Sequence, residues 1–267
     1  MKKITKMIAT TVAAIACMSS FVGCDKKEAI TIGYTDYEPM NYKNESGELV
    51  GFDTELAEKV FKDLGYEVRF KLIEWGNKYS ELNSGTIDCV WNGFTANCAD
   101  ADDGIQRADK VDFSYYYMTN AQCVLRAATA TELTSTAGFE GMSVAYESGS
   151  AGDTYVNGVK DVNVNKKAVG SQMDAIREVK SGTAQYAVVD LLLAKSIAGQ
   201  GDFANVVINE GIVIDAEYYA VGFKKGSDLT AKVNEKFVEY AASGYLAELA
   251  AKYGLSNQVI TDYSDQK

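Results

Sequence analysis

Hydrophobic positions recur along this chain with two spacings, one typical of strands and one typical of helices. Residues 30–34 form a short apolar run that predicts a strand, and residues 66–72 alternate apolar with polar side chains, as a strand with one buried face does. Between them, residues 52–64 place their apolar side chains on one helical stripe, where we expect Asp53 to cap the helix and Gly65 to end it. This alternation of strand and helix predicts an α/β fold.

The same order of elements recurs in the second half of the chain. A Ser-Gly-Thr turn follows an expected helix at residues 84–86 and again at 181–183, and an apolar strand follows each turn. Gly93 and Asp190 each lie seven residues after the threonine of their turn. The repeat predicts two similar lobes with Gly93 and Asp190 at equivalent carboxyl ends of strands, where open α/β sheets bind ligands.

The remaining elements follow from the same patterns. They are a helix over 78–83, strands over 87–91 and 186–189, a strand and a helix-opening turn over 143–153, a helix over 191–198, a strand over 218–223, and a last helix with Leu229, Val233, Phe237 and Tyr240 on one stripe. The tail after Leu255 is expected to be a loose end.

The N-terminus predicts export from the cytoplasm. Three lysines precede an apolar stretch over residues 7–22 that ends at Gly23 and Cys24, which is typical of a signal peptide over residues 1–23. Residues 21–24 resemble the lipobox of bacterial lipoproteins, which implies a lipidated Cys24 followed by a charged tether over 24–28. The alternatives are a cut near Cys17 and secretion without a lipid.

Charge and composition exclude several classes of protein. The net charge is -11, and loss of the three lysines of the signal peptide would lower it to -14, so binding of nucleic acid through phosphate neutralisation is not expected. Such a chain is also repelled by anionic lipid, so the acyl anchor would have to hold it at the membrane. The absence of histidine removes Ser-His-Asp and Cys-His nucleophiles and the commonest zinc ligand. We therefore expect neither a metal nor a cofactor.

Three cysteines follow Cys24, with no CxxC spacing. Cys89 and Cys123 lie in apolar strand-like runs, where we expect small buried hydrophobes. Cys98 is the candidate for a disulfide, and the sequence leaves its redox state open.

One constellation carries a family resemblance. Arg107 precedes the run Val111, Asp112, Phe113, Ser114 and follows Trp75 and the segment over 91–95. This arrangement resembles the first lobe of the bacterial extracellular solute-binding proteins of family 3, the polar amino-acid receptors of ABC importers, and the resemblance covers residues 30–255.

The resemblance implies a fold of the type II periplasmic binding protein kind, with two α/β lobes joined by a two-stranded hinge. Lobe 1 would comprise residues 29–118 and 218–260, lobe 2 residues 119–217, and the tail residues 261–267. The crossings between the lobes would lie near 118–121 and 217–219.

The resemblance also implies which residues bind the main-chain end of an amino-acid ligand. Arg107 matches the arginine that binds the carboxylate, a role suited to its fixed fork of donors. Gly93 and Thr95 match the positions that offer a carbonyl to the ammonium and a hydroxyl plus N–H to the carboxylate. Without the motif, Arg107 reads as a surface arginine paired with Asp109 or Asp112.

In lobe 2, the amides of Ser150 and Ala151 would point at an anion from a helix N-terminus. Asp190 matches the aspartate that binds the ammonium, since a carboxylate in an apolar setting needs a partner. The plainer interpretations are an ordinary capped helix at Ser150 and a helix cap for residue 191 onward at Asp190.

The side chain of the ligand would be enclosed by Tyr37 and Trp75, which match aromatic wall positions, although each alone would more often be core. Glu147 matches a position that faces the ligand side chain and would select a polar or cationic group, and Asp36 would add to the same field.

Residues 97–104 form an acidic stretch where relatives are shorter. An EF-hand begun at Asp100 needs a glutamate at the position that Val111 occupies, so we expect a solvated loop rather than a calcium site.

These residues predict a monomeric, membrane-anchored receptor that closes on one amino acid and delivers it to an ABC-transporter permease, with no enzymatic activity. Two alternatives stay open. One is a cyclohexadienyl or arogenate dehydratase with Glu147 as general acid. The other is a lipid-anchored amino-acid sensor that reports to a signalling partner.

Overall fold

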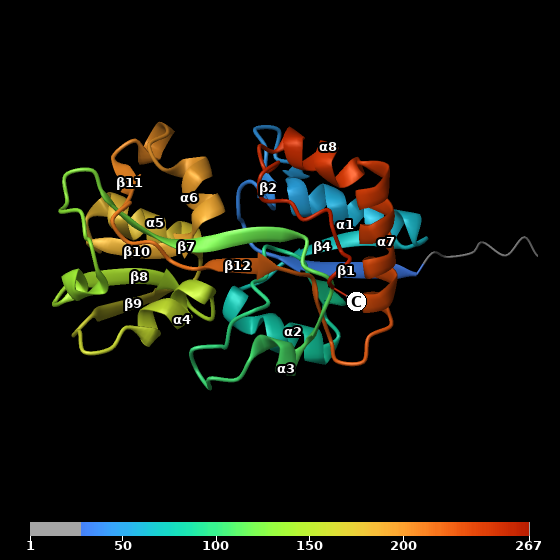
Figure 1. The fold of residues 1–267 in the computed structure, drawn as a ribbon, viewed down its shortest axis with the longest axis horizontal. Helices are drawn as coiled ribbons and strands as arrows, with labels where there is room; N and C mark the ends of the chain where they lie inside the picture. The colour runs from blue at the N-terminus through green and yellow to red at the C-terminus, as the bar shows by residue number, and fades with distance from the viewer. Residues whose placement is uncertain (1–27, 267) are drawn as a thin grey trace, which may run out of the picture.

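The structure is a computed structural model that describes residues 28–266. Its helices and strands form two α/β lobes side by side (Figure 1). The expectation of an α/β fold with two sheet-containing lobes is confirmed. Signal peptide, Cys24 and most of the tether lie outside the described residues.

The first lobe is built around a five-stranded sheet with the order β4-β1-β5-β13-β6, in which β1 is parallel to β4 and β5 while β13 is antiparallel to its neighbours. Its elements are β1 (Ala29–Tyr34), β2 (Tyr42–Lys43), β3 (Leu49–Val50), α1 (Phe52–Asp63), β4 (Glu67–Leu72), η1 (Trp75–Asn77), α2 (Lys78–Ser84), β5 (Cys89–Val90), α3 (Arg107–Lys110), β6 (Asp112–Phe113), β13 (Gly222–Phe223), α7 (Leu229–Ser243) and α8 (Tyr245–Lys252).

The second lobe is built around a sheet with the order β11-β7-β10-β8-β9. Its elements are β7 (Met118–Ala127), η2 (Thr136–Phe139), β8 (Ser143–Glu147), α4 (Ala151–Gly158), β9 (Asn165–Val169), α5 (Gln172–Ser181), β10 (Tyr186–Asp190), α6 (Leu191–Ile197), η3 (Gly201–Phe203), β11 (Val206–Ile208) and β12 (Ala216–Tyr219).

Two paired strands carry the chain between the lobes. The first half of β7 runs antiparallel to β12, with Met118 opposite Tyr219 and Ala121 opposite Ala216. Figure 1 shows both strands lying across the gap between the two halves. The chain therefore leaves the first sheet along β7 and returns to it after β12.

The Ser-Gly-Thr turns have the same local structure in both lobes. Gly85 and Gly182 each end a helix in the left-handed conformation, with φ of 73° and 77°. In each turn the threonine hydroxyl bonds to the hydroxyl of the turn's serine and donates to a carbonyl of the preceding helix. A glycine at this place relieves the steric cost that a side chain would meet.

Three expected details are wrong. Asp53 does not cap α1: the cap residue is Gly51, and the Asp53 carboxylate points elsewhere. The expected strand over 218–223 is two strands, because β12 pairs with β7 while β13 belongs to the first sheet. Leu72, expected on the buried face of β4, is 57% exposed because it is the last residue of that strand.

The C-terminal tail is not loose. Ile260 donates its N–H to the carbonyl of Tyr117, and Tyr263 is buried with its ring stacked on Phe237 and Tyr115. The polar composition of residues 256–266 conceals this one aromatic anchor. The tail therefore packs beside the start of β7.

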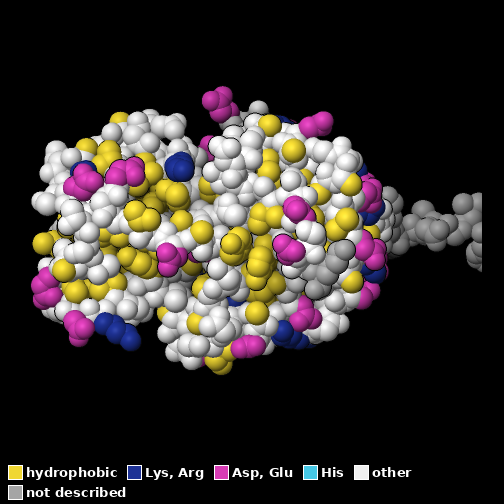
Figure 2. All heavy atoms as spheres, viewed as in Figure 1, with side chains coloured by type: hydrophobic (Ala, Val, Ile, Leu, Met, Phe, Trp, Pro, Cys, Tyr) yellow, Lys and Arg dark blue, Asp and Glu magenta, His cyan; other side chains and the backbone are white. Residues whose placement is uncertain are grey.

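The described cysteines are free: Cys89 and Cys123 are buried, as expected, and Cys98 is half-buried without a disulfide. Within residues 28–266 no helix combines the length and apolarity needed to cross a membrane. Acidic side chains are scattered over the visible face of both lobes rather than gathered in one patch (Figure 2).

Candidate functional site

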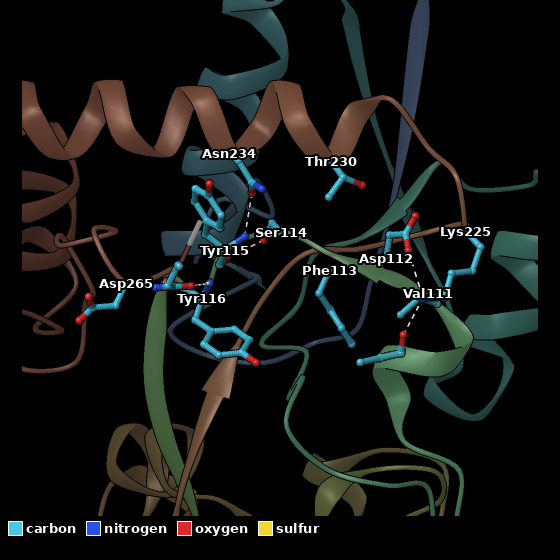
Figure 3. A pocket seen from close by; sticks show the side chains of 12 residues that line it. Val111, Asp112, Phe113, Ser114, Tyr115, Tyr116, Lys225, Thr230, Asn234 and Asp265 are labelled. Atoms are coloured by element: carbon cyan, nitrogen blue, oxygen red, sulfur yellow. Dashed lines mark hydrogen bonds and ion pairs between the residues drawn. The ribbon is translucent and has the colours of Figure 1, made fainter.

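One hollow of the described surface lies on the first lobe, away from the junction of the lobes. It has a volume of about 1070 Å³ and opens to solvent between β6, the start of α7 and the tail (Figure 3). Its polar groups bond to one another: Asn234 accepts from the amide of Tyr115, and Lys225 pairs with Asp112. The buried hydroxyl of Thr230, which also lines this hollow, has no hydrogen-bond partner.

A smaller cavity of about 250 Å³ lies between the lobes and contains the predicted site. Eight of the nine predicted ligand residues line it, namely Trp75, Gly93, Thr95, Arg107, Glu147, Ser150, Ala151 and Asp190. Asn92 and Gln172 line it too, and the sequence analysis missed both. The repeat offered one signal for Asn92, which directly precedes Gly93.

Tyr37 does not line this cavity. It is buried behind Gly93, and its hydroxyl lies 2.6 Å from the hydroxyl of Tyr219 on β12. A Cβ atom on Gly93 would lie 2.7 Å from the Tyr37 ring and 2.9 Å from the Tyr219 ring. Gly93 also has a φ of 56°, so both its conformation and its neighbours require a glycine.

The buried side chain of Asp53 stabilises the same turn through hydrogen bonds. Its carboxylate accepts hydrogen bonds of 2.8 Å from the Gly93 amide and from the hydroxyl of Tyr117. Burial raises the pKa of Asp53 to about 7, against the two hydrogen bonds that lower it. This carboxyl group therefore fixes the loop that carries Gly93 and the other polar residues of the first wall.

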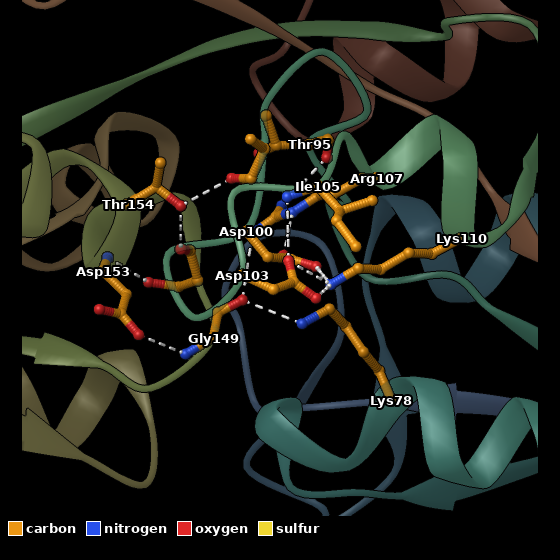
Figure 4. Close-up of polar contacts among 12 residues, drawn as sticks. Lys78, Thr95, Asp100, Asp103, Ile105, Arg107, Lys110, Gly149, Asp153 and Thr154 are labelled. Atoms are coloured by element: carbon orange, nitrogen blue, oxygen red, sulfur yellow. Dashed lines mark hydrogen bonds and ion pairs between the residues drawn. The ribbon is translucent and has the colours of Figure 1, made fainter.

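Arg107 is the first residue of α3 and is only 1% exposed. Its Nε donates to Asp100 at 2.9 Å, one terminal nitrogen donates to the carbonyl of Thr95 at 3.0 Å, and the other donates to the carbonyl of Gly149 at 3.0 Å (Figure 4). The interpretation of Arg107 as a surface residue paired with Asp109 or Asp112 is therefore wrong. A guanidinium has five N–H donors, so two remain for a ligand.

The partner of Arg107 comes from the acidic insertion, which was expected to be a solvated loop. Asp102 and Asp103 are exposed, but Asp100 is buried and also accepts from Lys110 at 2.7 Å. Although burial opposes it, the charge of Arg107 and the bond from Lys110 lower the pKa of Asp100 to about 2. The insertion thus supplies an ionised carboxylate that orients Arg107.

A second buried cation, Lys78, was missed by the sequence analysis. It begins α2, lies 4.6 Å from the ring centre of Tyr79 and 5.0 Å from that of Trp75, and donates to the carbonyl of Gly149 at 2.9 Å. Burial, followed by repulsion from Arg107, lowers the pKa of Lys78 to about 7. Two cations of the first lobe therefore converge on one carbonyl oxygen of the second.

The N-terminus of α4 forms part of the opposite wall. The Ser150 hydroxyl caps this helix by accepting from the amide of Asp153, and the Ser150 amide donates to the carbonyl of Glu147 at 3.2 Å. Ala151 is the first helical residue, whose N–H has no partner within a helix. Of the two amides expected to face an anion, the Ser150 amide therefore already has a partner in its own lobe.

Asp190 ends β10 in a buried position and does not cap α6 with its side chain. Its carboxylate accepts from the side-chain amides of Gln122 and Gln172, the latter at 2.7 Å, and its own amide donates to Gln172 at 2.8 Å. Burial raises the pKa of Asp190 because no protein cation pairs with it among the described residues.

Glu147 ends β8 and is also buried. Its Oε1 atom has no hydrogen-bond partner. Burial and the charge of Asp190 raise its pKa to about 8, while Lys78 lowers it without forming an ion pair. The cavity therefore holds a buried carboxyl group with one unpartnered oxygen, and the charge of Asp190 acts on it.

Within the described residues, no group of three or more acidic or cysteine side chains is placed to hold a metal ion. The polar groups of the cavity suit an organic ion instead. The first wall carries a guanidinium, and the second carries Asp190, Glu147 and a helix N-terminus. Such a site fits a molecule with a carboxylate at one place and positive charge at another.

Comparison with known sequences agrees with this geometry. A sequence model of the family described as bacterial extracellular solute-binding proteins, family 3, matches residues 30–256. The chain is 29% identical over 253 residues to the arginine-binding extracellular protein ArtP of Bacillus subtilis (strain 168), covering 91% of this chain and 93% of that protein. It is 27% identical over 232 residues to the L-cystine-binding protein TcyA of the same organism, covering 85% and 82%.

Solved structures show the same architecture. An ancestral arginine-binding protein bound to arginine superposes with a TM-score of 0.77 at 29% identity, covering 85% of this chain and 98% of that chain. An ABC uptake transporter substrate binding protein from Streptococcus pneumoniae with bound histidine gives a TM-score of 0.73 at 28% identity, covering 84% and 92%.

Proposed function

Because the chain belongs to family 3 of the bacterial extracellular solute-binding proteins, we propose that it captures a free amino acid between its lobes and delivers it to the permease of an ABC importer. The observation that carries this proposal is the pairing of opposite charges across one cavity. Arg107 faces it from the first lobe, and Asp190 faces it from the second. A free amino acid has the matching carboxylate and ammonium a few ångströms apart.

The two walls of the cavity indicate which groups bind the main-chain end of the ligand. The carboxylate takes the remaining donors of Arg107 and the amide of Ala151, next to Thr95. The ammonium takes the carboxylate of Asp190 and the carbonyl of Gly93. Each contact set draws on both lobes, so the full set exists only when the lobes are closed, and the ligand favours closure by that difference.

We propose that the ligand is an amino acid with a cationic side chain. Glu147 lines the cavity with an unpartnered oxygen, and a buried carboxylate is stable when a positive group pairs with it. Trp75, which also lines the cavity, offers an aromatic face to the same group. Arginine, lysine and protonated histidine meet both requirements. The arginine-binding protein ArtP and the Streptococcus protein with bound histidine fit this class.

The test is thermal unfolding of the protein without its first 24 residues, against each common amino acid and cystine in large excess. A ligand at one hundred times its dissociation constant stabilises the fold by about 2.7 kcal/mol, a shift of a few degrees. We expect shifts from the cationic amino acids. A shift from cystine or neutral amino acids alone would keep the receptor and remove the assignment of Glu147. No shift from any ligand would contradict the receptor itself.

We propose that the site binds its ligand without transforming it. The relatives ArtP and TcyA are named as binding proteins. Mass spectrometry of the ligand recovered after long incubation is expected to show it unchanged, and prephenate or arogenate is expected to keep its water and carboxyl group. Release of carbon dioxide from either would favour the dehydratase alternative.

The location of the protein is proposed from its N-terminus and family. We infer that residues 1–23 are removed as a signal peptide and that Cys24 is lipidated, which holds a monomer at the outer face of the cell membrane. Cys24→Ser is expected to release the protein into the medium in fractionation experiments. The paired strands β7 and β12 would serve as the hinge between lobe 1 and lobe 2.

A further inference from the structure

One side-chain amide joins the ligand site to the crossing strands. Gln122, on β7, donates from its Nε2 atom both to Asp190 Oδ1 and to Glu217 Oε1, the latter at 2.9 Å. Glu217 lies on β12, opposite Asn120, which donates to the same Oε1 atom at 2.5 Å. Asp190 and Glu217 thus share a donor, which places their two oxygens within about 6 Å of each other.

The two carboxyl groups have no cation of their own. Both are buried, and no lysine or arginine nitrogen of the described residues lies within 4 Å of either. Arg107 lowers the pKa of both from a distance, but its ion pair is with Asp100. Two buried carboxylates at this spacing cannot both ionise cheaply, so such pairs retain a proton.

We propose that Glu217 and Gln122 are positioning residues that make ligand capture proton-linked: the Asp190–Glu217 pair holds one proton in the unliganded site, and the ammonium of the ligand replaces it. This inference rests on the proposed function. In the exchange, one ammonium enters beside the pair and one proton leaves to solvent, so the charge at the pair itself is unchanged. The exchange takes place at the proposed hinge itself, because Gln122 lies on β7 and Glu217 lies on β12.

The surroundings of Glu217 favour this assignment. The ionisable groups that face the Asp190–Glu217 pair are Glu147 at the end of β8, Cys123 on β7, Arg107 on α3, Cys98 in the acidic insertion, Tyr37 after β1 and Tyr219 on β12. Arg107 is the cation of this set. Burial, and next the charge of Asp190, raise the pKa of Glu217 to about 8, so the proton is present at neutral pH.

Titration calorimetry tests the exchange. The amino acid that gives the largest thermal shift is titrated at pH 7 in buffers of different ionisation enthalpy, which yields the number of protons released per ligand bound. We expect Glu217→Gln to release about one proton fewer than the wild type, because Asp190 is then ionised before the ligand arrives. Glu248→Gln, an exposed position on α8, is the matched control and is expected to equal the wild type. Equal proton numbers in Glu217→Gln and the wild type overturn the proposal.

A ligand-free measurement separates this inference from the receptor function. A carboxyl group whose folded pKa exceeds its unfolded pKa stabilises the fold at low pH, and that contribution is lost as the pH rises to the folded value. The wild-type melting temperature is therefore expected to fall relative to Glu217→Gln between pH 5 and pH 8. Parallel curves overturn the proton pair even if amino acids bind, whereas diverging curves support it even if none does.

A second variant guards against misfolding of the first. Gln122→Met keeps both carboxyl groups and removes the shared donor that favours their ionised forms. It is expected to move the pH dependence of the melting temperature to higher pH. An unchanged pH dependence in this variant contradicts the role of Gln122.

Discussion

The guanidinium of Arg107 donates a 3.0 Å hydrogen bond across the junction of the lobes to the carbonyl oxygen of Gly149. Lys78 donates to the same oxygen at 2.9 Å. The residue proposed to bind the ligand carboxylate therefore also holds the lobes together. Ligand binding and closure share one side chain, so loss of that side chain should affect both.

Arg107→Ala is expected to weaken amino-acid binding by at least about thirtyfold, or about 2 kcal/mol, because it removes one partner of a buried charge pair. Calorimetry measures this, with the exposed Arg69→Ala as control. The variant also leaves Asp100 buried and without Arg107, so the double variant Arg107→Ala/Asp100→Asn should recover stability but not affinity. Near-unchanged affinity in the folded double variant would remove Arg107 from the site.

Glu147→Gln should change which ligands bind. Loss of the buried charge is expected to weaken the binding of a cationic amino acid about tenfold or more. The affinity for a neutral amino acid should change much less, because the amide keeps the shape of the side chain. The matched control is Glu210→Gln, an exposed position of the same lobe. An equal loss of affinity for cationic and neutral ligands would mean that Glu147 contributes to the shape of the cavity but does not select for charge.

Asp53 should give the fold a pH dependence. Its folded pKa is raised to about 7, so its contribution to stability is present at low pH and is lost as the pH rises from about 4 to 7, by at most about 1.4 kcal/mol per unit. Asp53→Asn is therefore expected to flatten the decline of the free energy of unfolding over this range. Urea titrations at pH 4.5, 6 and 7.5 measure it. A decline as steep as that of the wild type would contradict the assignment.

The acidic insertion provides a contact between the lobes that can be removed alone. The Thr154 hydroxyl, on α4, donates to the carbonyl of Ala99 at 2.9 Å. Thr154→Val keeps the shape and removes this bond, so affinity should fall by about two- to tenfold, as expected for one hydrogen bond that exists only in the closed state. Thr183→Val, at an exposed turn of the second lobe, is the control.

Much of this site could be predicted because its residues stand in a linear motif. Gly93 and Asp190 were predicted from their distance to strands whose carboxyl ends form the ligand edge of a sheet, whereas Arg107 and Thr95 were predicted from the family resemblance. Periodicity also located most helices and strands, since their apolar stripes face buried hydrophobic clusters. The repeated Ser-Gly-Thr turn was a local pattern with a local structural cause, and it has the same bonds in both lobes.

The sequence could not predict the partners that long-range contacts bring together. Asp100 lies in a stretch that reads as solvated, and only the fold shows that it turns inward onto Arg107. Gln122 and Glu217 lie 95 residues apart and meet because β7 and β12 pair. Asp53 resembled a helix cap in every local respect, yet its carboxylate is used by Gly93.

The tail offers the last prediction, because it packs against the start of a crossing strand. Val259 bridges to Met118, and the buried ring of Tyr263 stacks on Phe237 with the ring centres 6.1 Å apart. Tyr263→Ala should lower the free energy of unfolding by about 3 kcal/mol, as loss of a large buried ring does. Tyr263→Phe keeps the ring and loses only the hydrogen bond to the carbonyl of Ile260, so it should cost about 1 kcal/mol. Urea denaturation compares the two. If Tyr263→Ala unfolds within about 0.5 kcal/mol of the wild type, residues 256–266 do not stabilise the start of β7.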